Sequence, residues 1–173
     1  YEMDPTDANA DVIAFTVDFL DLAGNAGVQV TALVNDADGG VSFDKQAPSF
    51  TDVSIASYNA VSTATADDHG TRAKSGDNIT VTLESDEDLQ VGLDPTVTIA
   101  GNTAVVTRNT ASTFSATYEM SISDEDIDGD AIEINISSYE DPAGNEGEIV
   151  TDTNDGSEVI FDMSAPVLGT VTI

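Results

Sequence analysis

The sequence predicts an all-β fold in which antiparallel β-sandwich repeats follow one another in tandem. The apolar residues are mainly Val, Ile and Ala, and Thr is abundant, a mixture that favours strands over helices. In several segments apolar and polar residues alternate, as in a strand that buries one face. Blocks of sequence also recur at an interval of about one domain.

Four blocks recur in the same order. They pair Tyr1-Glu2-Met3 with Tyr118-Glu119-Met120, 21–27 with 141–147, 41–48 with 159–166, and 51–55 with 170–173. Asp141 follows Asp21 by 120 residues and Tyr118 follows Tyr1 by 117, which is the length of one sandwich. We therefore expect residues 1–45 to be the C-terminal part of one repeat, 46–163 a complete repeat, and 164–173 the first strand of the next.

Seven strands are predicted inside the complete repeat. Ile79, Val81 and Leu83, for example, alternate with threonines, and Gly-containing turn signals separate the segments. The predicted strands are 50–57, 78–86, 95–107, 113–121, 131–140, 146–151 and 157–162. Seven strands in about 116 residues is close to the count of an immunoglobulin-like sandwich.

These blocks also resemble a known family. The run from FDKQAPSFTDVSIAS, through NITVTLESDEDL and PTVTIAGN, to YEDPAGNEG and VIFDMSAP is similar to the bacterial and archaeal Ig-like tandem repeats of giant cell-surface proteins. The resemblance covers essentially the whole chain. It implies an Ig-like fold and an extracellular location at the cell surface. It also implies an array of neighbouring repeats or copies, as in S-layer proteins and large repetitive adhesins.

The charge limits the choice of partners. The formal net charge is −29, from 33 acids against four bases, so the chain repels polyphosphate and anionic lipid. We expect no nucleic-acid binding, no insertion of this segment into a membrane, and a setting rich in cations. The sequence opens in mid-pattern, so we interpret it as a piece of a longer protein.

No constellation of residues predicts an enzyme. The chain has no Cys, and its single histidine, His69, lies in a turn-like DDHGT segment. Some pair of carboxylates at a catalytic spacing is certain among so many acids and therefore indicates nothing. We expect a non-enzymatic protein.

The strongest motif for metal binding is DEDIDGD, residues 124–130. Asp124, Asp126 and Asp128, followed by Gly129, match the start of an EF-hand-type calcium loop, and Asp130 would add a carbonyl oxygen. The twelfth position is Asn135 rather than Glu, and the flanks are predicted strands. The sequence thus predicts a Ca²⁺ site here, with a solvated acidic loop as the alternative.

A second metal site is implied by the resemblance. In the related surface proteins, carboxylates at the joints between repeats hold calcium, and the matching residues here are Asp44, Asp162, Asp141 and Asn145. The alternative for Asp141 and Asn145 is a purely structural turn, in which the carboxylate accepts hydrogen bonds from nearby backbone N–H groups. Two further sequences, at Asn78 and Asn135, match the acceptor motif for N-glycosylation.

We therefore expect a structural module of a large secreted surface protein, stiffened by divalent cations, in an S-layer lattice or an adhesin stalk. One alternative is a module that binds a glycan or a protein through exposed aromatic residues. Tyr58 and Tyr139 are the candidates, although Tyr139 is expected to pack under a turn. The other alternative is a strand-donating filament subunit, because residues 1–45 lack the first half of their sandwich.

Overall fold

The computed structural model describes residues 2–32, 40–58, 71–124 and 131–172. The chain divides into two compact units, Tyr1–Gln46 and Ala47–Ile173. The described residues contain strands and turns but no helix, which confirms the predicted all-β class. Accordingly, they include no helix with the length and hydrophobicity that a membrane span requires.

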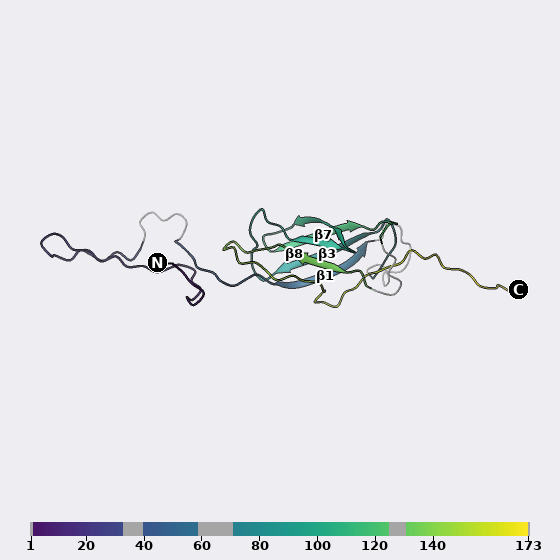
Figure 1. The fold of residues 1–173 in the computed structure, drawn as a ribbon, viewed down its shortest axis with the longest axis horizontal. Coiled ribbons are helices and arrows are strands. Elements are labelled where there is room, and N and C mark those ends of the chain that lie inside the picture. Colours follow the sequence, from purple (N-terminus) through teal and green to yellow (C-terminus); the bar gives the residue numbers. More distant parts are fainter. Residues whose placement is uncertain (1, 33–39, 59–70, 125–130, 173) are drawn as a thin grey trace. The chain divides into compact units, whose positions relative to one another are not determined.

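The second unit contains all the assigned strands (Figure 1). They are β1 (Phe50–Tyr58), β2 (Arg72–Ala73), β3 (Asn78–Ser85), β4 (Thr96–Ile99), β5 (Asn102–Thr103), β6 (Val105–Arg108), β7 (Thr113–Glu119), β8 (Ile134–Ser137) and β9 (Ile160–Phe161). One antiparallel sheet has the order β1-β3-β7-β6, and another has the order β5-β4-β8. A short parallel pair joins β2 and β9.

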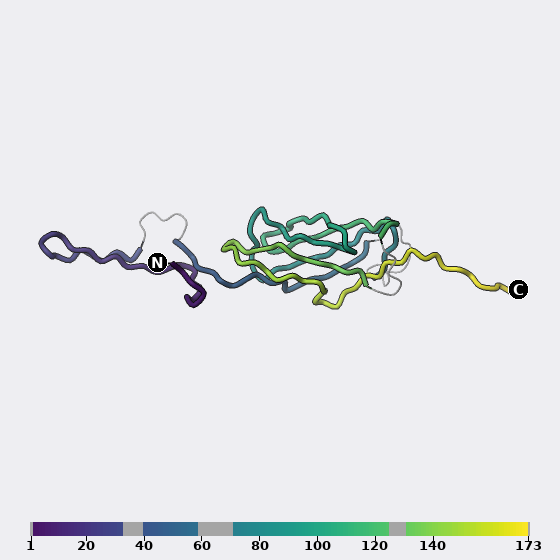
Figure 2. Tube along the Cα trace, in the orientation of Figure 1, coloured from purple at the N-terminus to yellow at the C-terminus, as the bar shows by residue number. Residues whose placement is uncertain are grey.

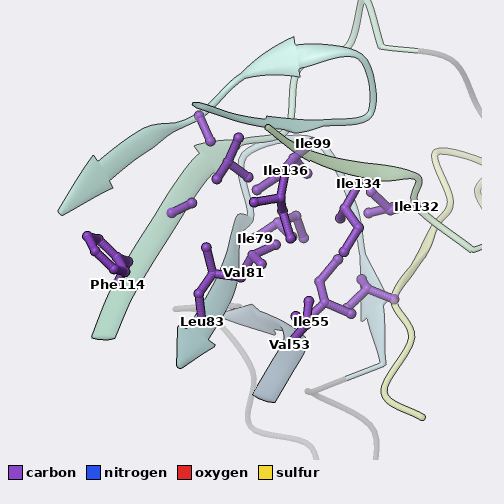
Figure 3. Packing of buried hydrophobic residues seen from close by; sticks show 14 of the residues in the cluster. Val53, Ile55, Ile79, Val81, Leu83, Ile99, Phe114, Ile132, Ile134 and Ile136 are labelled. Atoms are coloured by element: carbon purple, nitrogen blue, oxygen red, sulfur yellow. The ribbon is translucent and has the colours of Figure 1, made fainter. Parts of the chain in front are cut away.

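The two antiparallel sheets bury their apolar side chains in one common core. From the first sheet, Val81 and Leu83 of β3 and Phe114 of β7 are fully buried, and from the second, so are Ile99 of β4 and Ile136 of β8. Figure 3 shows these side chains gathered in the same space. The alternation in the sequence thus places the apolar side chains of each strand on one face, and these faces pack against each other between the sheets.

Some predicted strand boundaries are wrong. The predicted strand 95–107 is instead three strands, β4, β5 and β6, because Ala100 and Gly101 have φ of 49° and 74° and reverse the chain. The segment 146–151 forms only isolated bridges, Glu140 with Glu146 and Ile136 with Val150. The predicted strand 131–140 is reduced to β8, and Ser138, with φ of 58°, directly follows its end.

A hairpin with matching hydrogen bonds around its turn occurs in each unit, although Ile136 and Tyr139 are three residues apart where Val17 and Phe19 are two apart. In the first unit the Gly27 N–H donates to the Phe19 carbonyl (2.9 Å), and in the second unit the Gly147 N–H donates to the Tyr139 carbonyl (3.0 Å). Likewise, the Val30 N–H donates to the Val17 carbonyl (3.1 Å), and the Val150 N–H donates to the Ile136 carbonyl (3.0 Å). In Figure 2 the purple trace of residues 17–30 runs out and back as this hairpin.

An aromatic ring covers the glycine in both hairpins. A Cβ at Gly147 would lie 2.0 Å from the ring of Tyr139, and a Cβ at Gly27 would lie 2.2 Å from the ring of Phe19. The Tyr139 hydroxyl donates to the Glu148 carbonyl at 2.7 Å, and its ring contacts Phe50 of β1 with a centroid separation of 4.6 Å. Tyr139 is 2% exposed, which confirms that it packs under the turn.

The common core leads to a test of stability. We expect Ile136→Ala to lower the free energy of unfolding by about 2–5 kcal/mol, because it leaves a cavity between the sheets. The same substitution at Ile122, which is 80% exposed, should change it by no more than about 0.5 kcal/mol. Urea unfolding followed by circular dichroism measures both values. Equal effects of the two variants would contradict the core described above.

Candidate functional site

Asp141, which is buried, and Asn145, which is half-buried, meet in one turn. Asp141 Oδ1 accepts from the backbone N–H groups of Ala143 (2.8 Å) and Asn145 (2.9 Å), and its Oδ2 accepts from the Asn145 side-chain amide (2.6 Å). Gly144 takes φ of 90° to close the turn. Asp141 is only 1% exposed, so these donors replace the water that a carboxylate otherwise needs. The structural role proposed for this turn is therefore present.

The first unit builds the same turn around Asp21. Its Oδ1 accepts from Ala23 N–H (2.9 Å) and Asn25 N–H (2.8 Å), and its Oδ2 accepts from the Asn25 side-chain amide (2.8 Å). These bonds, the side-chain bond from Asn25 first, hold the pKa of Asp21 below its usual value of 3.8. The turn is thus specified locally, because it forms around an exposed aspartate as well as around a buried one.

The two predicted joint residues that precede Ala-Pro also bond locally. Asp44 Oδ1 accepts from the Gln46 N–H (3.0 Å) and from the Asn9 side-chain amide (3.2 Å). Asp162 Oδ1 accepts from the Ser164 N–H at 2.7 Å. Each carboxylate therefore accepts a bond from the backbone two residues further along the chain, as in an Asx turn. The calcium role of these residues stays a prediction.

Of the DEDIDGD loop, only Asp124 lies within the described residues; Asp126, Asp128 and Asp130 lie outside them. Asp124 Oδ2 accepts from the Ser121 N–H (2.6 Å). Its Oδ1 accepts from the Tyr118 hydroxyl (3.1 Å) and the Asn102 side-chain amide (3.2 Å). Burial and this hydrogen bond raise the pKa of Tyr118. Asp124 thus ties the entrance of the loop to β5 and β7, and the calcium site itself stays a prediction.

Glu87 was not identified from the sequence. Its carboxylate oxygen lies within 4.8 Å of that of Asp141, and the side chain is half-buried. A cation between two carboxylates at this separation would relieve their repulsion. The acidic stretch SDED contains Glu87, but only the tertiary fold shows which of its acids approaches Asp141.

The remaining predicted positions lie on strands. Asn78 is the exposed first residue of β3. Asn135 lies in β8, half-buried, and lines a hollow of about 400 Å³ together with Thr98 and Asp152. Tyr58 is exposed at the C-terminal end of β1. Glycosylation at the two asparagines stays a prediction.

Comparison with known proteins adds no relative. No protein-family model, no curated protein and no solved structure matches the chain.

The turn around Asp141 allows a structural role and a metal-binding role to be separated. In the presence of a chelator, we expect Asp141→Ala to lower the free energy of unfolding of the second unit by about 2–4 kcal/mol, since it removes the acceptor of three part-buried hydrogen bonds. Asp88→Ala, which removes an exposed carboxylate of the same kind, should have an effect below about 0.5 kcal/mol. Urea unfolding with chelator and with calcium measures both. A loss seen only with calcium would contradict the structural role and indicate a metal ligand.

The Asp21 turn predicts a pH dependence. Because its folded pKa is lowered, the turn is stabilised fully above pH 3.8, and this stabilisation is lost as the pH falls through the folded pKa. A carboxylate titration followed by NMR should therefore give Asp21 a midpoint below 3.8. In Asn25→Ala, which removes the largest cause, the midpoint should rise. An unchanged midpoint in that variant would show that the side-chain bond does not form in solution.

Proposed function

We propose that this chain is a non-enzymatic structural module of a large cell-surface protein, built from Ig-like sandwich repeats in tandem. The observation that carries the proposal is the hairpin that occurs twice, with turns at Asp21 and Asp141 that are 120 residues apart. The two copies agree in the backbone bonds of the turn, in the aspartate that holds the turn and in the aromatic ring over the glycine, and they differ by one residue beyond that ring. Such agreement is expected of repeats of one structural unit.

The second unit supports the sandwich part of the proposal. Its two antiparallel sheets enclose a single core, as the layers of a sandwich do. β4 and β8 belong to one sheet while β3 and β7 belong to the other, so the chain crosses between layers as in Greek-key sandwiches. An Ig-like topology is consistent with this order.

The arrangement of the acids supports a structural role over a catalytic one. Asp21, Asp44, Asp141 and Asp162 each accept hydrogen bonds from the backbone of their own turn. Bonds of this kind fix the chain direction at the ends of strands. The remaining acids give the surface a strong negative charge, which a cation-rich extracellular medium screens. We therefore place the module in an S-layer lattice or an adhesin stalk, with divalent cations stiffening it.

Calorimetry of the whole chain tests the cation part. In constant high sodium, which screens general repulsion, calcium at about 100 times its dissociation constant should raise the melting temperature by roughly 5–10 °C relative to chelator. Asp126→Ala with Asp128→Ala should abolish the rise. The exposed pair Asp11→Ala with Asp88→Ala should preserve it.

No rise would make DEDIDGD a solvated acidic loop and remove cation stiffening from the proposal. The array part has its own test in small-angle scattering and electron microscopy. A chain that neither assembles nor forms extended rods in any salt would contradict an array role.

A further inference from the structure

Strand β1 forms one border of its sheet and is the longest strand among the described residues (Figure 1). It spans nine residues, whereas the other border strands are short: β6 and β8 have four residues each and β5 has two. A long border strand presents backbone N–H and C=O groups with which a strand of another chain can pair, and short border strands reduce this hazard. The border of β1 therefore needs a protection that the other borders do not.

The sequence of β1 adds to this hazard. Residues 53–58 read Val-Ser-Ile-Ala-Ser-Tyr and contain no charged residue, no Pro and no Gly. Such a composition is typical of segments that pair between chains. In an antiparallel pair only alternate residues exchange bonds with the partner strand, and the N–H groups of Val53 and Ile55 face the open edge.

Residues 153–157, which we call the edge guard, occupy this edge without forming a strand. Asn154 makes three of the contacts. Its Oδ1 accepts from the Val53 N–H (2.8 Å), and its own backbone N–H donates to the Val53 carbonyl (3.1 Å). Its side-chain amide donates to the Phe50 carbonyl (3.3 Å). One side chain thus bonds to an N–H and to a carbonyl of β1, as a neighbouring strand would.

Ser157 occupies the next open position of β1. Its Oγ accepts from the Ile55 N–H at 2.8 Å. The edge guard is held in shape by its own bonds, since the Thr153 hydroxyl donates to the Ser157 carbonyl (2.7 Å) and Asp155 Oδ1 accepts from the Ser157 N–H (2.8 Å). Gly156, with φ of 80°, bends the chain between them. The edge guard therefore reaches β1 mainly through side chains and offers no extended backbone of its own to a further strand.

We propose that the edge guard prevents a second copy of this chain from pairing its own β1 with this edge. β1 can pair antiparallel with itself, because Val53 and Ile55 present their backbone groups along the same side. Such a contact uses the same segment of both copies and joins their sheets into one. The edge guard occupies these groups, and exposed acids in it and beside it repel a second copy; they are Asp152, Asp155 and Glu158.

The edge guard competes well because it belongs to the same chain as β1. An attached segment acts at an effective concentration on the order of millimolar, which exceeds that of a second copy in dilute solution. Three of its four bonds to β1 use the side chains of Asn154 and Ser157, so loss of these side chains should open the edge. The edge guard lies inside the second unit, so its role does not depend on the proposed cell-surface function or on cation binding.

Removing the two side chains tests the edge guard. We expect Asn154→Ala with Ser157→Ala to lower the dissociation constant of self-association of the full chain at least tenfold, because the freed edge gains several backbone bonds on pairing. Sedimentation velocity in chelator measures it at about 1 M NaCl, where the Debye length is roughly 3 Å and repulsion between copies is screened. Asn109→Ala with Ser123→Ala, the same changes at other exposed positions, should leave it unchanged.

A third substitution tests whether the contact lies on β1. Ala56 is an exposed residue of β1. Adding Ala56→Asp to the double variant brings like charges together in a β1–β1 pair and should return the dissociation constant to that of the unmodified chain. Ala56→Ser, which adds no charge, should not. Association that Ala56→Asp leaves unchanged would place the contact elsewhere and overturn the proposal.

Amide hydrogen exchange keeps the proposal testable if the double variant does not fold. At low protein concentration, Ser157→Ala should raise the exchange rate of the Ile55 amide at least tenfold, while Val81 in the central strand β3 is unchanged. Ser157→Thr, which keeps the hydroxyl, should retain the protection. Equal exchange at Ile55 in the unmodified chain and in Ser157→Ala would overturn the proposal, as would a folded double variant that associates no more strongly than the unmodified chain. Because chelator is present throughout, these outcomes are independent of the calcium test above.

Discussion

The structure depends on the burial of one apolar stripe per strand. A strand presents its side chains alternately to two faces, so an apolar stripe is buried only if a second layer lies over it. In the second unit β3 presents Ile79, Val81 and Leu83, and β4 and β8 of the other sheet provide the facing layer. Hydrogen bonds along the ladders fix the register, but it is the shared core that requires two sheets.

The acidity of the chain is compatible with this core because many acids are placed at turns. A carboxylate that accepts two or three N–H bonds satisfies backbone donors that a turn leaves without partners. Asp141 shows the limiting case, since it is almost completely buried and yet fully supplied with donors. The same residue type therefore builds the turns and, elsewhere on the surface, supplies the charge.

Features of the fold that arise from neighbouring residues could be predicted from the sequence, whereas features that arise from contacts between distant segments could not. The strands β3 and β7 have long runs of alternation, and the predicted segments contain them. The segment 95–107 alternates only at Val97 and Ile99, and the positive φ of Ala100 and Gly101 then reverses the chain, which the alternation does not predict. The approach of Glu87 to Asp141 has no local signal, because it arises from packing between distant segments. The calcium loop remains a prediction, since most of it lies outside the described residues.

The paired hairpins separate what is local from what is not. Phe19 and Tyr139 each cover a glycine in a hairpin with the same backbone bonds, yet Phe19 is 53% exposed and Tyr139 only 2%. The aspartate, the glycines and the aromatic ring are therefore sufficient to define the hairpin, and burial is contributed by the strands that cover it. The recurring sequence thus specifies the hairpin in both units, but it does not specify the strands that bury the hairpin. In the second unit part of this burial comes from β1, where Phe50 lies against the ring of Tyr139 with a centroid separation of 4.6 Å.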